Sequence, residues 1–384
     1  MKRLAIVTTH PIQYYAPIFK LLHERGQIAV KVFYTWGEAA LNKYDPGFQK
    51  AIQWDTPLLE GYPYEWAVNR ASNPGSHHYK GIITPDLNTQ IENWKPDAIL
   101  VFGWAYKGHF AVMRHFSGKV PIFFRGDSTL LDKSSGIKSV VKKIFLKQIY
   151  NKVDCAFYVG KNNHAYYKAY GLPDDQLIFA PHAVDNDKFS ANHSQEAFDL
   201  RRQLNLSAED VLILFAGKFG AKKNPLLLVE AFKKFRKSNI HLLFVGNGRL
   251  EGELKDKANG DSAIHFMDFQ NQSIMPAIYQ AVDLFCLPSA GPGETWGLAV
   301  NEAMAAGKAI VVSDKVGCAV DLVKNDVNGE VFKSNSVDEL ADVLHRITTN
   351  KDKLLQMGRR SAEIIKLWSF TEIVRAIEER LNQN

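Results

Sequence analysis

The sequence predicts an α/β protein made of two doubly wound, Rossmann-like domains, each built on a parallel sheet, that face a common cleft. Three observations support this fold class. The chain has 384 residues, which exceeds one domain of ordinary size. Short runs rich in Val, Ile, Leu and Phe alternate with longer segments of helical periodicity, a pattern typical of parallel strands joined by helices. The alternation stops near the middle of the chain and then starts again, so we expect two such domains.

The expected strands form two series. The first half contains five of them, at residues 4–8, 30–34, 98–102, 121–124 and 155–159. The second half contains five more, at residues 211–216, 241–245, 263–267, 284–287 and 309–313. We place the division at residue 188, so that the N-terminal domain spans 1–188 and the C-terminal domain 189–384. The last expected helix, at about residues 370–381, can pack back on the first domain.

Composition excludes several classes of protein. Hydrophobic residues make up 46% and charged residues 23% of the chain, which is ordinary globular usage. Three scattered cysteines are too few for a disulfide framework or a zinc cluster and suit a reducing compartment. The N-terminal apolar run is too short for a signal peptide, and no run is long enough to span a membrane. We therefore expect a cytoplasmic protein whose net charge of +6 suits anionic ligands.

The densest motif, residues 288–307, is a Gly- and Pro-rich loop that leads from a predicted strand into a helix. The helix is expected to begin at about Leu298 and to end at Gly307. The free backbone N–H groups at Gly297, Leu298 and Ala299, together with the positive end of the helix dipole, form a candidate phosphate site.

Two glutamates flank this candidate phosphate site. Glu294 precedes the helix and Glu302 lies one turn inside it. Carboxylates placed in this way can reach the two ends of a nucleotide sugar whose phosphates lie between them. Taken alone, two such glutamates are more often only a loop charge and a surface helix charge.

In this context the Glu-x7-Glu spacing resembles the signature of retaining glycosyltransferases of the GT-B fold, the glycosyl transferases group 1 or family 4. The resemblance covers essentially the whole second half, and the first half shares the strand order and a hinge-like segment at residues 181–185. It implies a GT-B architecture, an acceptor in the first domain and a nucleotide-sugar donor in the second. It also implies transfer to an acceptor hydroxyl with retention of configuration.

The resemblance also implies roles for individual residues. Glu302 is expected to hold the ribose hydroxyls and Glu294 the hydroxyls of the transferred sugar. Lys218 and Lys223 are expected to neutralise the diphosphate as negative charge develops on the leaving group. Further nucleotide contacts are assigned to Gly217, Gly246, Phe266 and Met267.

The first half departs from the family pattern at two loops. Residues 8–15 replace the glycine-rich turn of many members, and Arg125-Gly126-Asp127 stands where many carry a histidine. Arg125 is a candidate for binding phosphate or an acidic acceptor, and Asp127 for orienting a hydroxyl, unless the two form a structural pair. His10 is a candidate for the missing histidine's role, although a lone loop histidine is often structural.

A basic amphipathic helix is expected at residues 137–149. The surrounding segment, 133–152, contains six lysines and no acidic residue, and the apolar side chains of the helix recur on one face. Such a helix can lie on an anionic membrane surface. An ordinary helix of the first domain with a solvated basic face remains the alternative.

Three other functions compete with glycosyl transfer. Gly246-Asn247-Gly248, followed by Asp268, partly imitates a dinucleotide fingerprint and suggests an NAD-dependent oxidoreductase. A nucleotide-sugar epimerase and a binding protein with a decayed active site share the expected fold. If the chain is a glycosyltransferase, we expect no metal, no cofactor and no nucleic-acid partner. The expected donor is a nucleoside diphosphate sugar, preferably of UDP, and the expected acceptor is a glycan or a lipid-linked glycan.

Overall fold

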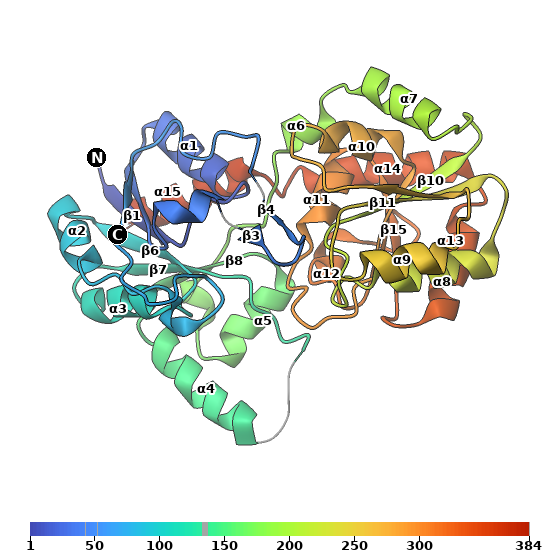
Figure 1. Ribbon diagram of the computed structural model, residues 1–384. Helices are drawn as coiled ribbons and strands as arrows, with labels where there is room; N and C mark the ends of the chain where they lie inside the picture. Colours follow the sequence, from blue (N-terminus) through green and yellow to red (C-terminus); the bar gives the residue numbers. More distant parts are fainter. Residues whose placement is uncertain (43, 52, 133–136, 384) are drawn as a thin grey trace. The chain divides into compact units, whose positions relative to one another are not determined.

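The chain folds into two compact units (Figure 1). The computed structural model describes residues 1–42, 44–51, 53–132 and 137–383. Unit 1 comprises Met1–Lys43, Thr56–His182 and Phe370–Asn384, and unit 2 comprises Tyr44–Asp55 and Ala183–Ser369. Each unit is an α/β domain with its own parallel sheet, as the sequence predicts.

Unit 1 is built on a seven-stranded parallel sheet in the order β5-β2-β1-β6-β7-β8-β9. Its strands are β1 (Arg3–Thr8), β2 (Ala29–Tyr34), β5 (Tyr64–Trp66), β6 (Ala98–Phe102), β7 (Ile122–Arg125), β8 (Cys155–Tyr158) and β9 (Leu177–Phe179). Its helices are α1 (Ala16–Arg25), α2 (Leu87–Trp94), α3 (Lys107–Phe116), α4 (Ile137–Tyr150), α5 (Lys161–Ala169) and α15 (Phe370–Gln383). Every residue of β6 is buried, as expected for a central parallel strand that is covered on both faces.

Unit 2 is built on a six-stranded parallel sheet in the order β12-β11-β10-β13-β14-β15. Its strands are β10 (Val211–Ala216), β11 (Ile240–Val245), β12 (Ile264–Met267), β13 (Leu284–Leu287), β14 (Ala309–Ser313) and β15 (Gly329–Phe332). Its longer helices are α7 (Ser194–Gln203), α8 (Pro225–Phe235), α9 (Glu251–Ala258), α10 (Met275–Ala281), α11 (Leu298–Ala305), α13 (Val337–Ile347) and α14 (Lys351–Ile365), and two short ones are α6 (Asn186–Ser190) and α12 (Ala319–Leu322). The sheet has the strand order of a Rossmann fold, which places its topological switch point between β10 and β13.

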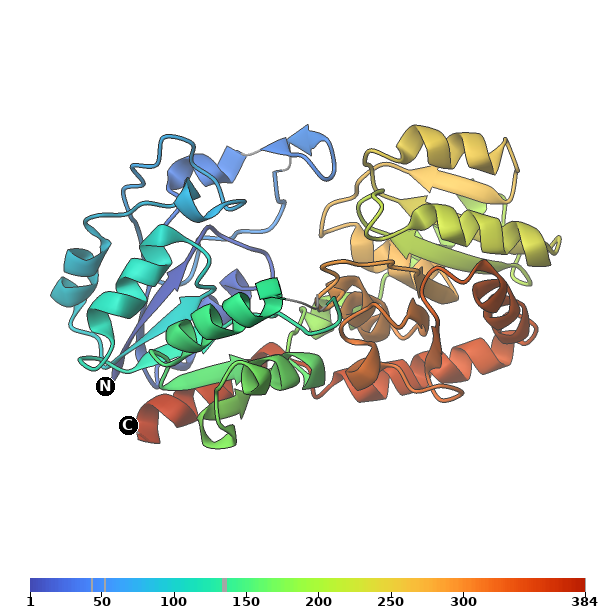
Figure 2. The ribbon, with the colours of Figure 1, turned by 90° about the horizontal axis from the view of Figure 1, so that it is seen from below.

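The chain passes from unit 1 to unit 2 between His182 and Ala183, a few residues before the predicted division at 188. Residue 188 lies inside helix α6, whose N-terminus is capped by the side chain of Asp185 accepting a hydrogen bond from the backbone of Lys188. Helix α15 packs against α1 and β9 of unit 1 (Figure 2, red). The chain therefore returns to the first unit for its last helix.

Residues 44–55 are assigned to unit 2 although the sequence on both sides of them belongs to unit 1. They include a small antiparallel hairpin of β3 (Tyr44–Asp45) and β4 (Lys50–Ala51). The sequence patterns do not predict this segment.

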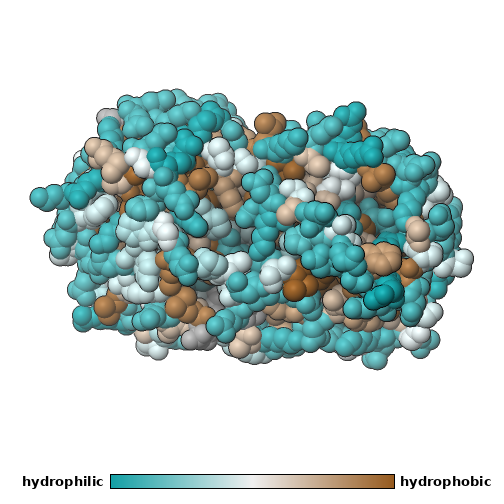
Figure 3. Space-filling view, turned by 90° about the horizontal axis from the view of Figure 1, so that it is seen from above, coloured by the Kyte–Doolittle hydropathy of each residue, from teal (hydrophilic) through white to brown (hydrophobic). Residues whose placement is uncertain are grey.

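Hydrophobic side chains fill the layers between the sheets and their helices, while the face shown in Figure 3 is mainly hydrophilic, with apolar side chains scattered over it. The three cysteines are free and buried. Among the helices that the structure describes, none combines the length and the apolar composition needed to cross a bilayer.

Candidate functional site

The loops that follow β10 and β13 of unit 2, together with helix α11, carry more than half of the predicted site residues. The two strands are hydrogen-bonded neighbours, with Ile213 opposite Leu284 and Leu214 opposite Phe285. Their carboxyl ends therefore meet at the switch point of the sheet, where ligands bind in open α/β folds. This topology explains why residues 217–223 and 288–297, far apart in sequence, belong to one candidate site.

Glu294 is the centre of a compact charged cluster in this site. Its carboxylate accepts hydrogen bonds from Lys223 Nζ, at 3.2 Å from Oε2, and from Ser289 Oγ, at 3.3 Å. Lys222 Nζ lies 3.9 Å from the same oxygen. Burial alone would raise the pKa of Glu294, but the positive charges of Lys223 and Lys222, with the hydrogen bonds, outweigh it and lower the pKa below its usual value. Glu294 is therefore a buried carboxylate that stays ionised.

The N-terminus of α11 is presented by a tightly packed loop. Gly297 has φ +103°, and a Cβ atom there would lie 2.9 Å from Val316 Cγ1. The backbone N–H of Gly317 donates to the carbonyl of Glu294 at 3.0 Å, and that of Cys318 to the carbonyl of Trp296 at 3.0 Å. The first turn of the helix, at Leu298 and Ala299, presents N–H groups that have no acceptor inside the helix, which makes this turn suited to an anion.

Glu302 lies on α11 and is 4% exposed. Tyr279 Oη donates to Glu302 Oε2 at 2.8 Å, and Gln272 Nε2 lies 3.5 Å from Oε1. The sequence reasoning did not single out Tyr279 as a site residue. Its ring is fully buried and packs edge-on against Phe189, so the hydroxyl is held at the glutamate by the core of unit 2.

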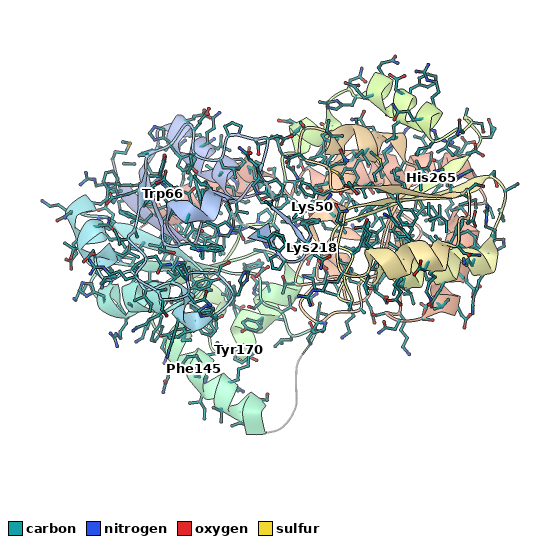
Figure 4. All side chains as sticks on the ribbon, viewed as in Figure 1. Lys50, Trp66, Phe145, Tyr170, Lys218 and His265 are labelled. Atoms are coloured by element: carbon teal, nitrogen blue, oxygen red, sulfur yellow. The ribbon has the colours of Figure 1, made fainter. Side chains whose placement is uncertain are left out.

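Lys218 and Lys223, predicted as a pair, have different partners. Lys223 pairs with Glu294, whereas Lys218 Nζ lies 2.9 Å from Asp45 Oδ2 in the β3–β4 hairpin. Lys218 also lies over the ring of Phe48, with Nζ 5.0 Å from the ring centroid. Figure 4 shows Lys218, together with Lys50, at the hairpin.

Gly217 and Gly246 lie in successive loops at the same edge of the sheet. Gly217 donates its N–H to the carbonyl of Val245, and Gly246 donates to that of Met267. A Cβ atom on Gly246 would lie 2.1 Å from the carbonyl oxygen of Gly217. These two glycines thus permit close backbone packing, and Phe266 stacks on Phe244 with ring centroids 5.5 Å apart.

This geometry weakens the dinucleotide alternative. A Cβ atom on Gly248 would lie 2.5 Å from the carbonyl oxygen of Phe219, so the glycine serves contact with a neighbouring loop. The following helix, α9, carries Glu251 and Glu253 in its first turn. Asn247 Nδ2 donates to Glu251 and to Asp268, at 3.0 and 3.1 Å. Negative charge therefore stands where a pyrophosphate would have to bind.

Arg125, a predicted site residue of unit 1, is engaged with the backbone. The side chain is buried, and its Nη1 and Nη2 donate to the carbonyls of Ala180 and Pro181, at 2.7 and 2.8 Å. In this arrangement its terminal nitrogens hold the residues that precede the crossing into unit 2, a structural role that the sequence reasoning missed. The phosphate or acceptor contact proposed from the sequence is not available to these nitrogens here.

Asp127 and His10 lie elsewhere in unit 1. Asp127 is about half exposed and its Oδ2 lies 4.0 Å from His182 Nε2. Burial, followed by the charge of Arg125, lowers the pKa of His182 to about 3 against the opposing effect of Asp127. His10 follows β1, with its Nδ1 2.8 Å from Thr9 Oγ1 and its ring edge-on to Trp36.

The described residues contain no group of three or more His, Cys, Asp and Glu side chains arranged to hold a metal ion. The Asp185-Asn186-Asp187 sequence serves as the start of helix α6. Metal independence of the reaction stays a prediction.

The chain is similar to known glycosyltransferases. A sequence model of the family glycosyl transferases group 1 matches residues 196–363, the part that holds Lys218, Glu294 and Glu302. The second half of the chain therefore resembles the glycosyl transferases group 1.

Two relatives align with about half of the chain. The lipopolysaccharide 1,2-N-acetylglucosaminetransferase of Salmonella typhimurium is 27% identical over 223 residues, which cover 55% of this chain and 57% of that protein. The UDP-Gal:alpha-D-GlcNAc-diphosphoundecaprenol alpha-1,3-galactosyltransferase of Escherichia coli is 30% identical over 185 residues, 46% of each chain. The chain thus spans about half the length of the curated relatives that it matches.

Solved structures resemble the chain over its whole length. HepE of Anabaena, in complex with UDP and glucose, has a TM-score of 0.73 and 16% sequence identity, and the similarity covers 100% of both chains. This likeness shows the fold: two parallel-sheet, Rossmann-like domains of the GT-B type.

Proposed function

We propose that the protein is a glycosyltransferase that moves a sugar from a nucleoside diphosphate donor, with UDP favoured, to an acceptor hydroxyl with retention of configuration. The observation that carries the proposal is the group at the switch point of unit 2: Glu294 with Lys223, the N-terminus of α11, and Glu302. The lysine and the helix N-terminus suit a diphosphate, and the two carboxylates suit the hydroxyl groups of the sugar and the ribose on either side of it.

In the proposed mechanism, Lys218, Lys223 and the start of α11 stabilise the charge that develops on the diphosphate as the glycosidic bond breaks. Glu302 accepts hydrogen bonds from the ribose hydroxyls, with Tyr279 Oη fixing its carboxylate. Glu294 accepts from hydroxyls of the transferred sugar, and its low pKa keeps it an acceptor at neutral pH. We assign the acceptor to unit 1.

The favoured acceptor is a glycan or a lipid-linked glycan. The two relatives support this class, since one is named for lipopolysaccharide and the other for a diphosphoundecaprenol substrate. HepE, solved with UDP and glucose, supports UDP as the nucleotide.

Helix α4 supports a place at a membrane surface. Among its described side chains, the helix exposes the apolar residues Val140, Val141, Ile144 and Phe145, of which Val141 is 61% exposed. Lys142, Lys143 and Lys147 are exposed on the same helix, and Figure 4 labels Phe145. We propose that this surface rests on anionic lipid at the cytoplasmic face of the membrane, where a lipid-linked acceptor is presented.

The structure corrects one part of the helix prediction. Ile149, expected on the apolar face that meets the membrane, is buried in the core of unit 1 together with Leu146, so these two residues anchor the helix. The side chains of residues 133–138, including those of Lys133, Ile137 and Lys138, lie outside the described part of the chain.

The reaction is tested by supplying UDP-, GDP- and ADP-sugars with a lipid-linked glycan fraction. We expect release of one nucleoside diphosphate and attachment of its labelled sugar to the acceptor, with the donor's anomeric configuration in the product by NMR. Interconversion of the donor sugar without transfer would identify an epimerase instead. Donor binding without turnover on any acceptor tried would favour a decayed binding protein.

A further inference from the structure

Residues 44–55, described except for residue 52, form an arm that packs on the candidate donor site of unit 2. The arm contains the β3–β4 hairpin and contacts the loops after β10 and β12, at the carboxyl edge of the sheet. The proposed function assigns Lys218, in the first of these loops, to the diphosphate. The second loop follows Phe266 and Met267, to which the family resemblance assigns nucleotide contacts. The arm is therefore placed to influence donor binding.

Polar contacts hold the arm at several points. Asp45 pairs with Lys218 at 2.9 Å, and Lys50 Nζ lies 2.7 Å from Asp268 Oδ2. Nearer the end of the arm, Asn271 Nδ2 donates to the carbonyl of Gln53 at 2.7 Å. The backbone N–H of Ser273 donates to Asp55 Oδ2 at 3.0 Å, and the Ser273 hydroxyl donates to the same oxygen.

An aromatic cluster adds to these contacts. The ring of Phe269 lies 4.9 Å from that of Phe48 and 6.0 Å from that of Trp54, centroid to centroid, in edge-to-face arrangements. Such pairs add about 0.5–1.5 kcal/mol each beyond simple burial. The arm thus combines charge pairing at one end with aromatic packing beside the end of β12, the strand that carries Phe266 and Met267.

Asp45 is bound to Lys218 as a diphosphate oxygen would be. Burial alone would raise the pKa of Asp45, but the hydrogen bond and charge of Lys218, with the backbone N–H groups of Gly47 and Phe48, lower it. A Cβ atom on Gly47 would lie 2.5 Å from Lys218 Cδ, so the arm's backbone lies directly on the lysine stem. A phosphate that binds this ammonium competes with the carboxylate for its positive charge, and the two anions repel each other.

We propose that the arm is a latch on the donor site, in which Asp45 is an internal competitor for Lys218 that the donor diphosphate displaces. The inference rests on the proposed function, because it takes the ligand of Lys218 to be a diphosphate. Lys218 passes from the carboxylate to the phosphate, and the arm loses its charged contact at that end. Asp45 is thus a positioning residue whose removal strengthens diphosphate binding.

The test is calorimetric titration of inorganic pyrophosphate and of UDP into the wild type, Asp45→Asn and Asp55→Asn at one ionic strength. Asp55→Asn is the matched control, since it removes the same charge from the same arm. Asp55 contacts Ser273 and not Lys218. Because Lys218 is 43% exposed on its side chain, we expect Asp45→Asn to tighten pyrophosphate binding about three- to fivefold. Asp55→Asn should change it less than about twofold. Simple structural damage would weaken binding.

Two further measurements complete the test. In a Lys218→Met background, Asp45→Asn should give no further gain in affinity. Hydrogen exchange of the backbone of residues 44–51 should become faster when the wild type is saturated with UDP. Equal affinities in Asp45→Asn and Asp55→Asn, or slower exchange of the arm with UDP, would overturn the latch.

The outcomes separate this inference from the proposed function. UDP binding that is lost in Glu302→Ala but unchanged in Asp45→Asn would leave the donor site standing and refute only the latch. If UDP binds Asp45→Asn but not the wild type, Asp45 blocks the donor site and the latch is supported. Absence of diphosphate binding in every variant would refute both.

Discussion

Lys223 Nζ lies 3.2 Å from Glu294 Oε2, and this contact joins the loops that follow two neighbouring strands of unit 2. Glu294 is 7% exposed and the side chain of Lys223 is 16% exposed, so the pair is largely shielded from water. Breaking such a pair by removing one partner costs more than breaking an exposed one, because the other charge stays buried. The proposed donor site is thus built around a largely buried ion pair.

Glu294→Gln should impair turnover more than nucleotide affinity. The amide keeps the size of the side chain but removes the charge that balances Lys223 and accepts from the sugar. We expect kcat to fall about a hundredfold, as for loss of one preorganised electrostatic contact, with the Kd for UDP changed less than about fivefold. Glu253→Gln, on the exposed first turn of α9, is the control. Small and equal effects in both variants would contradict the assigned role.

Gly317→Ala should disrupt the loop that presents α11. A Cβ atom at this position would lie 1.8 Å from the carbonyl oxygen of Thr295, so the two backbone segments must separate. We expect a loss of about 1–3 kcal/mol in the free energy of unfolding, measured in urea, and weaker binding of UDP. Gly252→Ala, where no atom lies within 4 Å of the added methyl group, should leave both within error. An unchanged Gly317→Ala variant would show that the loop is not tightly fixed.

The stability of unit 1 should fall as the pH falls from about 6.5 to about 4. Burial lowers the pKa of His109 from 6.5 to about 4, although the ring contacts the carbonyl of Gly103 and Thr35 Oγ1, each at 2.8 Å. Between these pH values the unfolded chain binds a proton that the native state does not, so acid favours unfolding by up to about 1.4 kcal/mol per pH unit. His109→Gln should reduce this slope by one proton, as measured by urea unfolding at several pH values. An unchanged slope would contradict the buried neutral state.

The wild type should co-sediment with anionic vesicles and not with neutral ones. Each lysine at the surface contributes about 1 kcal/mol, so Lys142→Gln with Lys143→Gln should weaken binding about thirtyfold. The same double change at Lys233 and Lys234, near the C-terminus of α8, is the matched control and should have no such effect. Co-sedimentation that does not depend on anionic lipid would contradict the membrane surface on α4.

The central strands could be predicted because they are buried on both faces. The run at β10, Val-Leu-Ile-Leu-Phe-Ala, is apolar throughout and is buried at every position. Within the two parallel sheets, the sequence patterns do not predict β5, β9 and β15, which are short and lie at the edges of their sheets, where polar residues such as Glu65 and Glu330 interrupt the pattern. Such short segments carry too little periodicity to be recognised.

The candidate site was predictable only where one local segment carries it. The loop and helix from Glu294 to Glu302 are contiguous in sequence, and the structure has the helix begin at Leu298 as expected. The contacts of Tyr279 with Glu302 and of Asp45 with Lys218 join residues 23 and 173 positions apart. No local pattern encodes such contacts, because they arise from the order in which the strands assemble.

The partners of Arg125 are another example of contacts that no local sequence pattern encodes. Sequence reasoning placed Arg125 at the end of a strand, a position typical of ligand-binding residues. The carbonyls that it binds belong to Ala180 and Pro181, brought close because β9 completes the edge of the same sheet beside β8 and β7. Only the tertiary structure distinguishes this structural role from a catalytic one.

The most direct test of the proposed donor site is calorimetric titration of UDP, GDP, ADP and NAD into the wild type, Glu302→Ala and Tyr279→Phe. We expect one nucleoside diphosphate, with UDP favoured, to bind the wild type. Its binding should be lost in Glu302→Ala and weakened about tenfold in Tyr279→Phe, which removes the hydroxyl that donates to Glu302 Oε2 at 2.8 Å. Binding of NAD alone, or equal nucleotide affinities in the wild type and Glu302→Ala, would contradict the assignment of unit 2 as the donor site.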